Sequence, residues 1–165
     1  MSLLDYGVVG LYDPALVTVE LGLPVPVTVR GIADVDGAIK LTTRQRWTTT
    51  EGCDGERMRR RLRGRGGNLQ LVLMASSLTL DALTAVRFVD EQTGLGIFPV
   101  SILDLNGNGK RVAWAERAWL DGPPKEINFS PGAPPVVVNF ELDGLEVVLG
   151  SIRRLQGGLS EALRS

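Results

Sequence analysis

The sequence predicts an α+β fold that is mainly β: an antiparallel β-sandwich or barrel of about seven or eight strands with one packed α-helix. Short segments in which apolar and polar residues alternate recur along the chain, and glycine or proline bounds most of them. One segment, about residues 77–91, changes to the period of a helix. Helices and strands do not alternate as in a parallel sheet, which favours antiparallel pairing. Because no internal repeat and no domain boundary is visible, we expect a single domain over residues 1–165.

The expected strands follow one another with short polar connections. Residues 68–75, "NLQLVLMA", place three leucines on one face and predict a core strand. Residues 136–143 alternate in the same way, with valine, phenylalanine and leucine on one side and mostly polar residues on the other. The repeat "NGNG" at 106–109 predicts a hairpin turn between two further strands. The remaining strands are expected at 15–21, 25–30 and 39–43, on both sides of that turn within 96–120, and, as a short strand, in "PPKEINFS" at 123–130.

The predicted helix has recognisable ends. Leu83 and Val86 lie on its apolar face. Ser76 or Ser77 can cap the first turn, because a serine hydroxyl accepts a hydrogen bond from a free backbone N–H group there. Gly94 can end the helix in the left-handed conformation that glycine adopts without strain.

The two ends of the chain differ from its centre. Residues 1–14 contain glycines and a proline without a sustained period and predict an N-terminal arm. Residues 151–165 form an amphipathic C-terminal tail. The first residues lack the basic and apolar regions of a secretory signal, and no apolar run approaches the roughly 20 residues of a membrane span. We therefore expect a protein of the cytosol without membrane insertion.

The composition excludes several classes of catalytic site. The chain has no histidine and a single cysteine, Cys53, so neither a zinc site of the usual kind nor a histidine-activated nucleophile is expected. The carboxylates of Asp34 and Asp36 in "DVDG" remain, but no paired-acid arrangement and no cofactor motif accompany them. The run "DLNGNG" at 104–109 has the opening spacing of a calcium loop, but Ala115 stands where the closing glutamate is required. We expect no enzyme, no cofactor and no metal.

Positive charge is concentrated in one segment of an acidic chain. Six arginines fall within residues 57–65, and without them the net charge of −1 becomes −7. The surrounding segment, 48–67, is polar and glycine-rich without apolar periodicity, which predicts a long loop or a two-stranded flap. Three interpretations stay open: the arginines contact the acidic surface of a neighbouring copy, they bind phosphates of a nucleic acid, or they are only solvated.

Motifs in consistent order resemble the tail tube proteins of contractile-tailed bacteriophages and the related tubes of type VI secretion systems. They are "WTTTEGCDGERMRR" (47–60), "ASSLTLDAL" (75–83), "FPVSILD" (98–104) and "AWLDGPP" (118–124), and the likeness covers about residues 15–145. Leu80 replaces the asparagine that these proteins usually have at this position. Neither terminal segment has a counterpart, so a tube-initiator or tail-completion paralogue is the alternative within the same group.

The resemblance implies a structural virion protein. Such subunits form stacked hexameric rings inside a contractile sheath, and DNA passes through the lumen during ejection. The implied partners are further copies of the chain and the sheath, baseplate and neck proteins of a tail assembled in the cytoplasm of a host bacterium. A nucleic-acid-binding module that uses Arg57–Arg65 is the alternative from a different class.

Two groups of residues are candidates for this role. One group would contact a neighbouring ring or subunit: Arg57, Arg59, Arg60, Arg61, Arg63, Arg65 and Trp47. The other group would face the lumen, where negative charge repels phosphate, or would simply be solvated on an outer strand: Asn139, Glu141 and Asp143.

Overall fold

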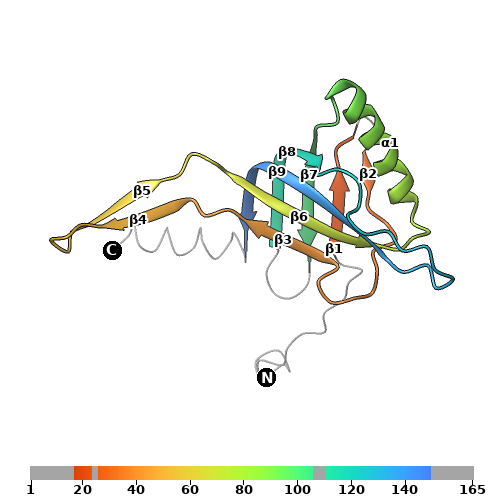
Figure 1. Ribbon diagram of the computed structural model, residues 1–165, viewed down its shortest axis with the longest axis horizontal. Helices are drawn as coiled ribbons and strands as arrows, with labels where there is room; N and C mark the ends of the chain where they lie inside the picture. Colours follow the sequence, from red (N-terminus) through yellow and green to blue (C-terminus); the bar gives the residue numbers. More distant parts are fainter. Residues whose placement is uncertain (1–16, 24–25, 106–110, 150–165) are drawn as a thin grey trace, which may run out of the picture.

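The computed structural model describes residues 17–23, 26–105 and 111–149 (Figure 1). The expected arm (1–14), the turn at 106–109 and the tail (151–165) lie outside the described residues. The elements are β1 (Val17–Leu21), β2 (Val27–Thr28), β3 (Ile39–Thr43), β4 (Trp47–Glu51), β5 (Arg57–Arg61), β6 (Gly66–Leu73), α1 (Leu78–Thr93), β7 (Phe98–Asp104), β8 (Arg111–Leu120) and β9 (Val136–Val148).

The described strands form one large and one small antiparallel sheet. The large sheet has seven strands in the order β2-β1-β7-β8-β9-β6-β3, and β4 pairs only with β5 in the two-stranded sheet. The predicted class, mainly β with antiparallel pairing and one helix, is confirmed. The expected short strand at 123–130 is wrong, because this proline-flanked segment has irregular backbone and its Phe129 is 93% exposed.

The large sheet is curled, so that its two edges approach each other at one end. The amide of Val29, just after β2, donates to the carbonyl of Val19 at 2.8 Å, whereas Ile32 pairs with Leu73 of β6 on the β3 side. Val29 and Ile32 are three positions apart in the chain, a length that spans about 10 Å at full extension. The sequence expectation of a sandwich or barrel therefore corresponds to a single sheet that is closed at one end and open at the other.

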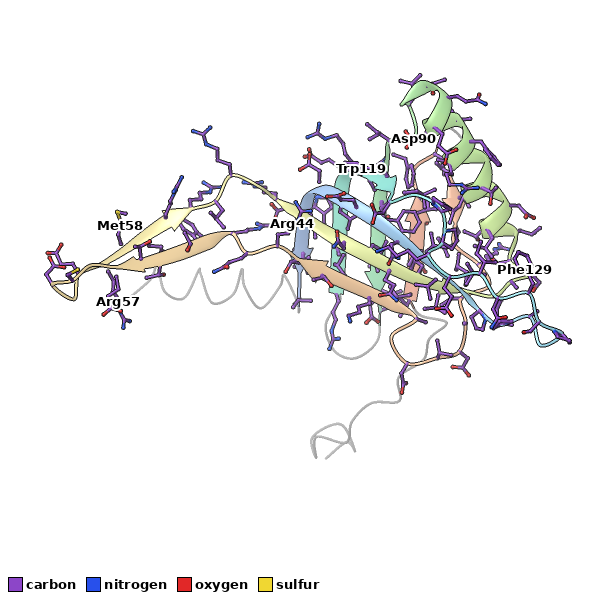
Figure 2. The ribbon with its side chains drawn as sticks, viewed as in Figure 1. Arg44, Arg57, Met58, Asp90, Trp119 and Phe129 are labelled. Carbon is purple, nitrogen blue, oxygen red and sulfur yellow. The ribbon has the colours of Figure 1, made fainter. Side chains whose placement is uncertain are left out.

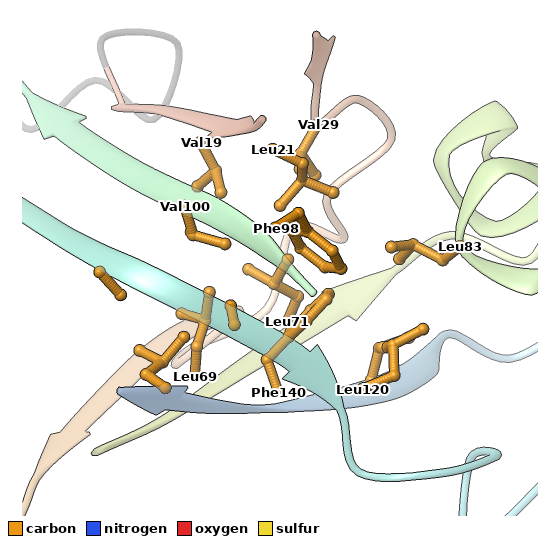
Figure 3. Packing of buried hydrophobic residues seen from close by; sticks show 14 of the residues in the cluster. Val19, Leu21, Val29, Leu69, Leu71, Leu83, Phe98, Val100, Leu120 and Phe140 are labelled. Carbon is orange, nitrogen blue, oxygen red and sulfur yellow. The ribbon is translucent and has the colours of Figure 1, made fainter. Parts of the chain in front are cut away.

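The concave face of the curled sheet holds the hydrophobic core. Alternate residues of β1, β6, β7 and β9 point inward, as the strand patterns predicted (Figure 3). At the centre, the rings of Phe98 and Phe140 meet edge to face with centroids 6.1 Å apart. The largest fully buried side chains are Phe140, Leu21, Leu69, Leu71, Leu73, Leu145, Val19 and Thr79.

The strands β8 and β9 each interrupt their regular alternation at one point. Between the pairs Phe98–Ala118 and Val100–Ala115, β8 contains one extra residue. In β9, Gly144 adopts a positive φ of 68°, and the buried positions change from Leu142 to Leu145, three residues on instead of two. This glycine lets the strand continue to Val148, past the predicted end at residue 143.

The helix α1 covers the closed end of the sheet (Figure 1). Its expected caps are confirmed: the Ser77 hydroxyl accepts from the amide of Thr79, and Gly94 is left-handed with a φ of 67°. The same serine hydroxyl donates to the carbonyl of Arg30, and the amide of Arg30 donates to the Thr79 hydroxyl. The helix start is thereby fixed to the segment that follows β2. Among the described residues, no helix is long and apolar enough to cross a membrane.

Gly67 tests the close packing of β3, β6 and β9. A Cβ atom at this position would lie 2.5 Å from the Thr42 carbonyl oxygen and 2.6 Å from a methyl carbon of Leu145. We expect Gly67→Ala to lower the free energy of unfolding by about 1–3 kcal/mol. Gly64→Ala is the matched control, because no atom lies within 4 Å of the place its added methyl group would take, and it should be neutral or slightly stabilising. Urea unfolding of both variants measures the difference, and equal stabilities would contradict the packing described.

Candidate functional site

The arginine-rich segment is a β-hairpin that projects from the sheet (Figure 1). Its strands β4 and β5 pair antiparallel from Trp47–Arg61 to Glu51–Arg57, and the amide of Gly52 donates to the carbonyl of Glu56 at 2.8 Å across the turn. Of the two sequence interpretations of 48–67, the two-stranded flap is confirmed and the long loop is wrong. The last two residues of that range, Gly66 and Gly67, already belong to β6.

The hairpin carries positive charge on both of its faces. Pairing places Arg57, Arg59 and Arg61 on one face, and Arg60 on the other beside Met58. Figure 2 shows Arg57 and Met58 pointing to opposite sides of the hairpin. All residues of β5 are exposed, so neither face is used in the packing of the chain itself.

On the first face, two guanidinium groups lie close to one indole ring. The guanidinium carbon of Arg59 lies 3.8 Å from the ring centroid of Trp47, and that of Arg61 lies 6.0 Å away. Such cation–π contacts fix the direction of long side chains without neutralising them. Trp47 remains 41% exposed. The arrangement combines an accessible aromatic ring with two accessible positive charges.

Most of the arginines on the hairpin are not neutralised by a carboxylate among the described residues. Arg57 is 3.7 Å from the carboxylate of Glu51, and both side chains are largely exposed. Within the described part of the chain, Arg59, Arg60, Arg61 and Arg63 form no salt bridge. The predicted contact residues are thus brought together on one protruding element, with their charges directed toward solvent.

Arg65 differs from the other predicted contact residues, because it belongs to the base of the hairpin. Its guanidinium lies 3.0 Å from Glu146 of β9, and Arg46 reaches the same carboxylate at 3.4 Å. Arg44, labelled in Figure 2, pairs with Glu141 at 2.7 Å. Exposed pairs of this kind each contribute less than about 1 kcal/mol. Together they join both strands of the hairpin base to β9 and so set the direction in which the hairpin projects.

The candidate lumen residues lie on the convex face of the sheet. Asn139, Glu141 and Asp143 alternate with the buried side chains of β9 and are half-buried. Glu141 pairs with Arg44, and Asp143 pairs with Arg117 of β8. Because both carboxylates are matched by arginines, this face carries less negative charge than the sequence of β9 alone suggests.

A cavity of about 880 Å³ occupies the open end of the curled sheet, and sequence reasoning missed it. The turn at 33–37 forms one side, with the carboxylates of Asp34 and Asp36 exposed. Alternation marked the inward side chains that line it, but the hollow exists only because the sheet is curled and open here. The other lining residues are Val17, Ile32, Ala38, Ile39, Leu41, Ile102, Asp104, Arg111, Val112, Ala113, Val147 and Leu149.

Three further observations concern the metal-ligating residue types and the calcium-like spacing of the sequence. Within the described residues, no group of three or more cysteine and carboxylate side chains is arranged to hold a metal ion. Cys53 is exposed in the turn of the hairpin. Asp104, the first residue of the calcium-like spacing, lies in β7 opposite Arg111 of β8.

A scan against protein-family models and a search of curated proteins found no match. Among solved structures, the cap of the anti-feeding prophage, described as its tube-terminating cap, matches with a TM-score of 0.54 and 13% identity, covering 91% of this chain and all of that one. This chain has the fold of that cap. At this identity the likeness concerns the fold alone.

Two weaker likenesses are to parts of an extracellular contractile injection system called PVC. Its sheath/tube terminator matches with a TM-score of 0.45 and 12% identity, over 87% of this chain and all of that one. Its sheath–tube complex matches with the same TM-score and identity, over 92% of this chain and 99% of that one.

Proposed function

We propose that this chain is a structural protein, not an enzyme, that associates with copies of itself to build part of the tube of a contractile tail-like particle. The observation that carries the proposal is the projecting hairpin, which exposes Trp47 and at least four arginines without salt bridges among the described residues. The rest of the chain supplies the complementary charge, −7 without the arginines of 57–65. The fold shared with a tube-terminating cap supports the same class of particle.

The proposal extends to the arrangement that the sequence resemblance implies. Copies would form hexameric rings around a lumen that conducts DNA, in contact with sheath, baseplate and neck proteins of a virion tail. A contact between different surfaces of identical subunits closes into a ring or continues as a stack. The likeness to a terminating cap favours a ring at the end of the tube over the repeated tube subunit.

Electron microscopy of the purified full-length chain, combined with light scattering, tests this proposal. Isolated rings are the expected result for an end ring. Long tubes would support self-association but identify the repeated subunit instead. A chain that stays monomeric at high concentration and forms no ring would overturn the structural proposal.

One observation favours a second function, the binding of a nucleic acid. The two faces of an exposed two-stranded ribbon both carry arginines, and such a ribbon can follow a phosphate backbone. This interpretation predicts that a monomeric protein retards DNA in a gel, with an affinity that falls steeply as salt rises. Ring formation together with salt-insensitive, weak DNA retention would reject it.

A further inference from the structure

We propose that the cavity at the open end of the sheet receives the hairpin of a second copy of this chain. In this contact Trp47 of one copy enters the cavity of the other, and Arg59 and Arg61 pair with Asp34 and Asp36. The inference rests on the proposed self-association and names the surface that the hairpin meets.

The cavity offers an apolar interior with an acidic rim. Its interior is formed by side chains from five strands and by the residue after β9: Val17, Ile39, Leu41, Ile102, Ala113, Val147 and Leu149. Three aspartates and one arginine also line it, so the charged side chains of the lining have a net charge of −2. A volume of about 880 Å³ lies in the range of cavities that enclose drug-sized molecules, so an indole ring fits with room for its neighbours.

The hairpin offers the complementary combination, an aromatic ring with two positive charges close to it. Trp47 is 41% exposed although it is the largest apolar side chain of the hairpin. Arg59 and Arg61 contact its ring and lie on the same face of β5. Tryptophan and arginine are the residues that most often dominate the binding energy of an interface.

The order of the charged and apolar side chains along the chain is similar on the two surfaces. Arg59 and Arg61 are two residues apart on a strand, which separates their Cα atoms by roughly 7 Å. Asp34 and Asp36 are also two residues apart, and Val35 between them is 48% exposed. Two guanidinium groups beside an indole therefore meet two carboxylates beside an apolar side chain. Arginine–carboxylate bonds of this kind are stronger than bonds between neutral groups.

The hairpin of a chain is directed away from the cavity of the same chain. The strand β3 starts next to the turn at 33–37 and runs toward the hairpin base, and β4 continues outward (Figure 1). From Ile39 to Trp47 the chain advances by eight residues, about 26 Å when extended. A contact between hairpin and cavity thus joins two copies through different surfaces, which is the geometry that rings and stacks require.

Charge reversal on each side tests the pairing. We expect Arg59→Glu/Arg61→Glu and Asp34→Arg/Asp36→Arg each to weaken self-association at least roughly tenfold, measured by analytical ultracentrifugation. The chain with all four substitutions should associate again, because the charges are exchanged. The affected side chains are exposed, so circular dichroism should show an unchanged fold. Lys125→Glu reverses an exposed charge in the segment between β8 and β9, outside both the hairpin and the cavity, so it is the control and should change association about threefold or less.

Trp47→Ala tests the apolar part of the contact and should weaken association roughly 30-fold, as expected for a tryptophan at the centre of an interface. If the arginine variant weakens association but the aspartate variant does not, the hairpin contacts a surface of the second copy other than the cavity. That result overturns this inference and leaves the proposed self-association intact. A wild-type chain that does not associate at any concentration overturns both.

Discussion

Replacing Phe140 with alanine is expected to lower the free energy of unfolding by about 3–5 kcal/mol. The side chain is 1% exposed, lies at the centre of the core on β9, and forms an edge-to-face contact with Phe98 (Figure 3). Truncation removes this contact and leaves a cavity at the centre of the core, which the surrounding strands cannot easily close. Since a domain of this kind is stable by only about 5–15 kcal/mol, urea or thermal unfolding should show a large shift.

A second phenylalanine provides the matched control for this prediction. Phe129 lies in the irregular segment between β8 and β9, at the end of the molecule remote from the hairpin (Figure 2), and is 93% exposed. Phe129→Ala should change the stability by less than about 0.5 kcal/mol. Similar losses for both variants would contradict the position of the core inside the curled sheet.

The strands of the core could be predicted because each has one buried face. In β6 and β9 buried apolar residues alternate with less buried, mostly polar ones, so the period of two was visible, and the inward side chains Leu71 and Phe140 followed from it. The helix was predictable for a different reason, since its ends are set by local chemistry at Ser77 and Gly94. Both kinds of signal lie within a few neighbouring residues.

The curl of the sheet could not be predicted, because it depends on contacts between distant segments. The bridge from Ile32 to Leu73 joins residues far apart in the sequence, and the extra residue of β8 is defined only by its pairing with β7. No local sequence pattern indicates either of them. The cavity follows from the curl and was missed for the same reason. The continuation of β9 through Gly144 was hidden as well, since an aspartate–glycine pair in a sequence ordinarily favours a turn.

The hairpin was only half predictable. Its strands are largely exposed on both faces, so neither Thr48–Thr50 nor the opposite residues, Met58, Arg59 and Arg60, show apolar alternation along a strand. The threonines and Trp47 nevertheless favour a strand, and the glycines between them and the arginines favour a turn. The sequence also grouped Arg65 with the other arginines, whereas its pairing with Glu146 places it at the hairpin base.

Removal of the hairpin is expected to abolish self-association while the fold is retained. At the base, the amide of Leu62 donates to the carbonyl of Arg46 at 2.8 Å, so these residues already face each other across the two strands. Replacing residues 47–61 with asparagine–glycine joins them through a two-residue turn of the type that closes hairpins. The salt bridges at the hairpin base, from Arg44, Arg46 and Arg65 to β9, are kept, and the core strands are unchanged.

The shortened chain should unfold within a few degrees of the full-length chain, because β4 and β5 bury little of the core, but it should sediment as a monomer. Full-length protein carrying Gly64→Ala in the same measurement controls for a change near the hairpin base that keeps every contact. Rings of unchanged size from the shortened chain would exclude the hairpin as the contact between copies. If the shortened chain still assembled but no longer retained DNA, the arginines would bind a nucleic acid. The same exposed charges would then contact phosphates rather than the carboxylates of a second copy.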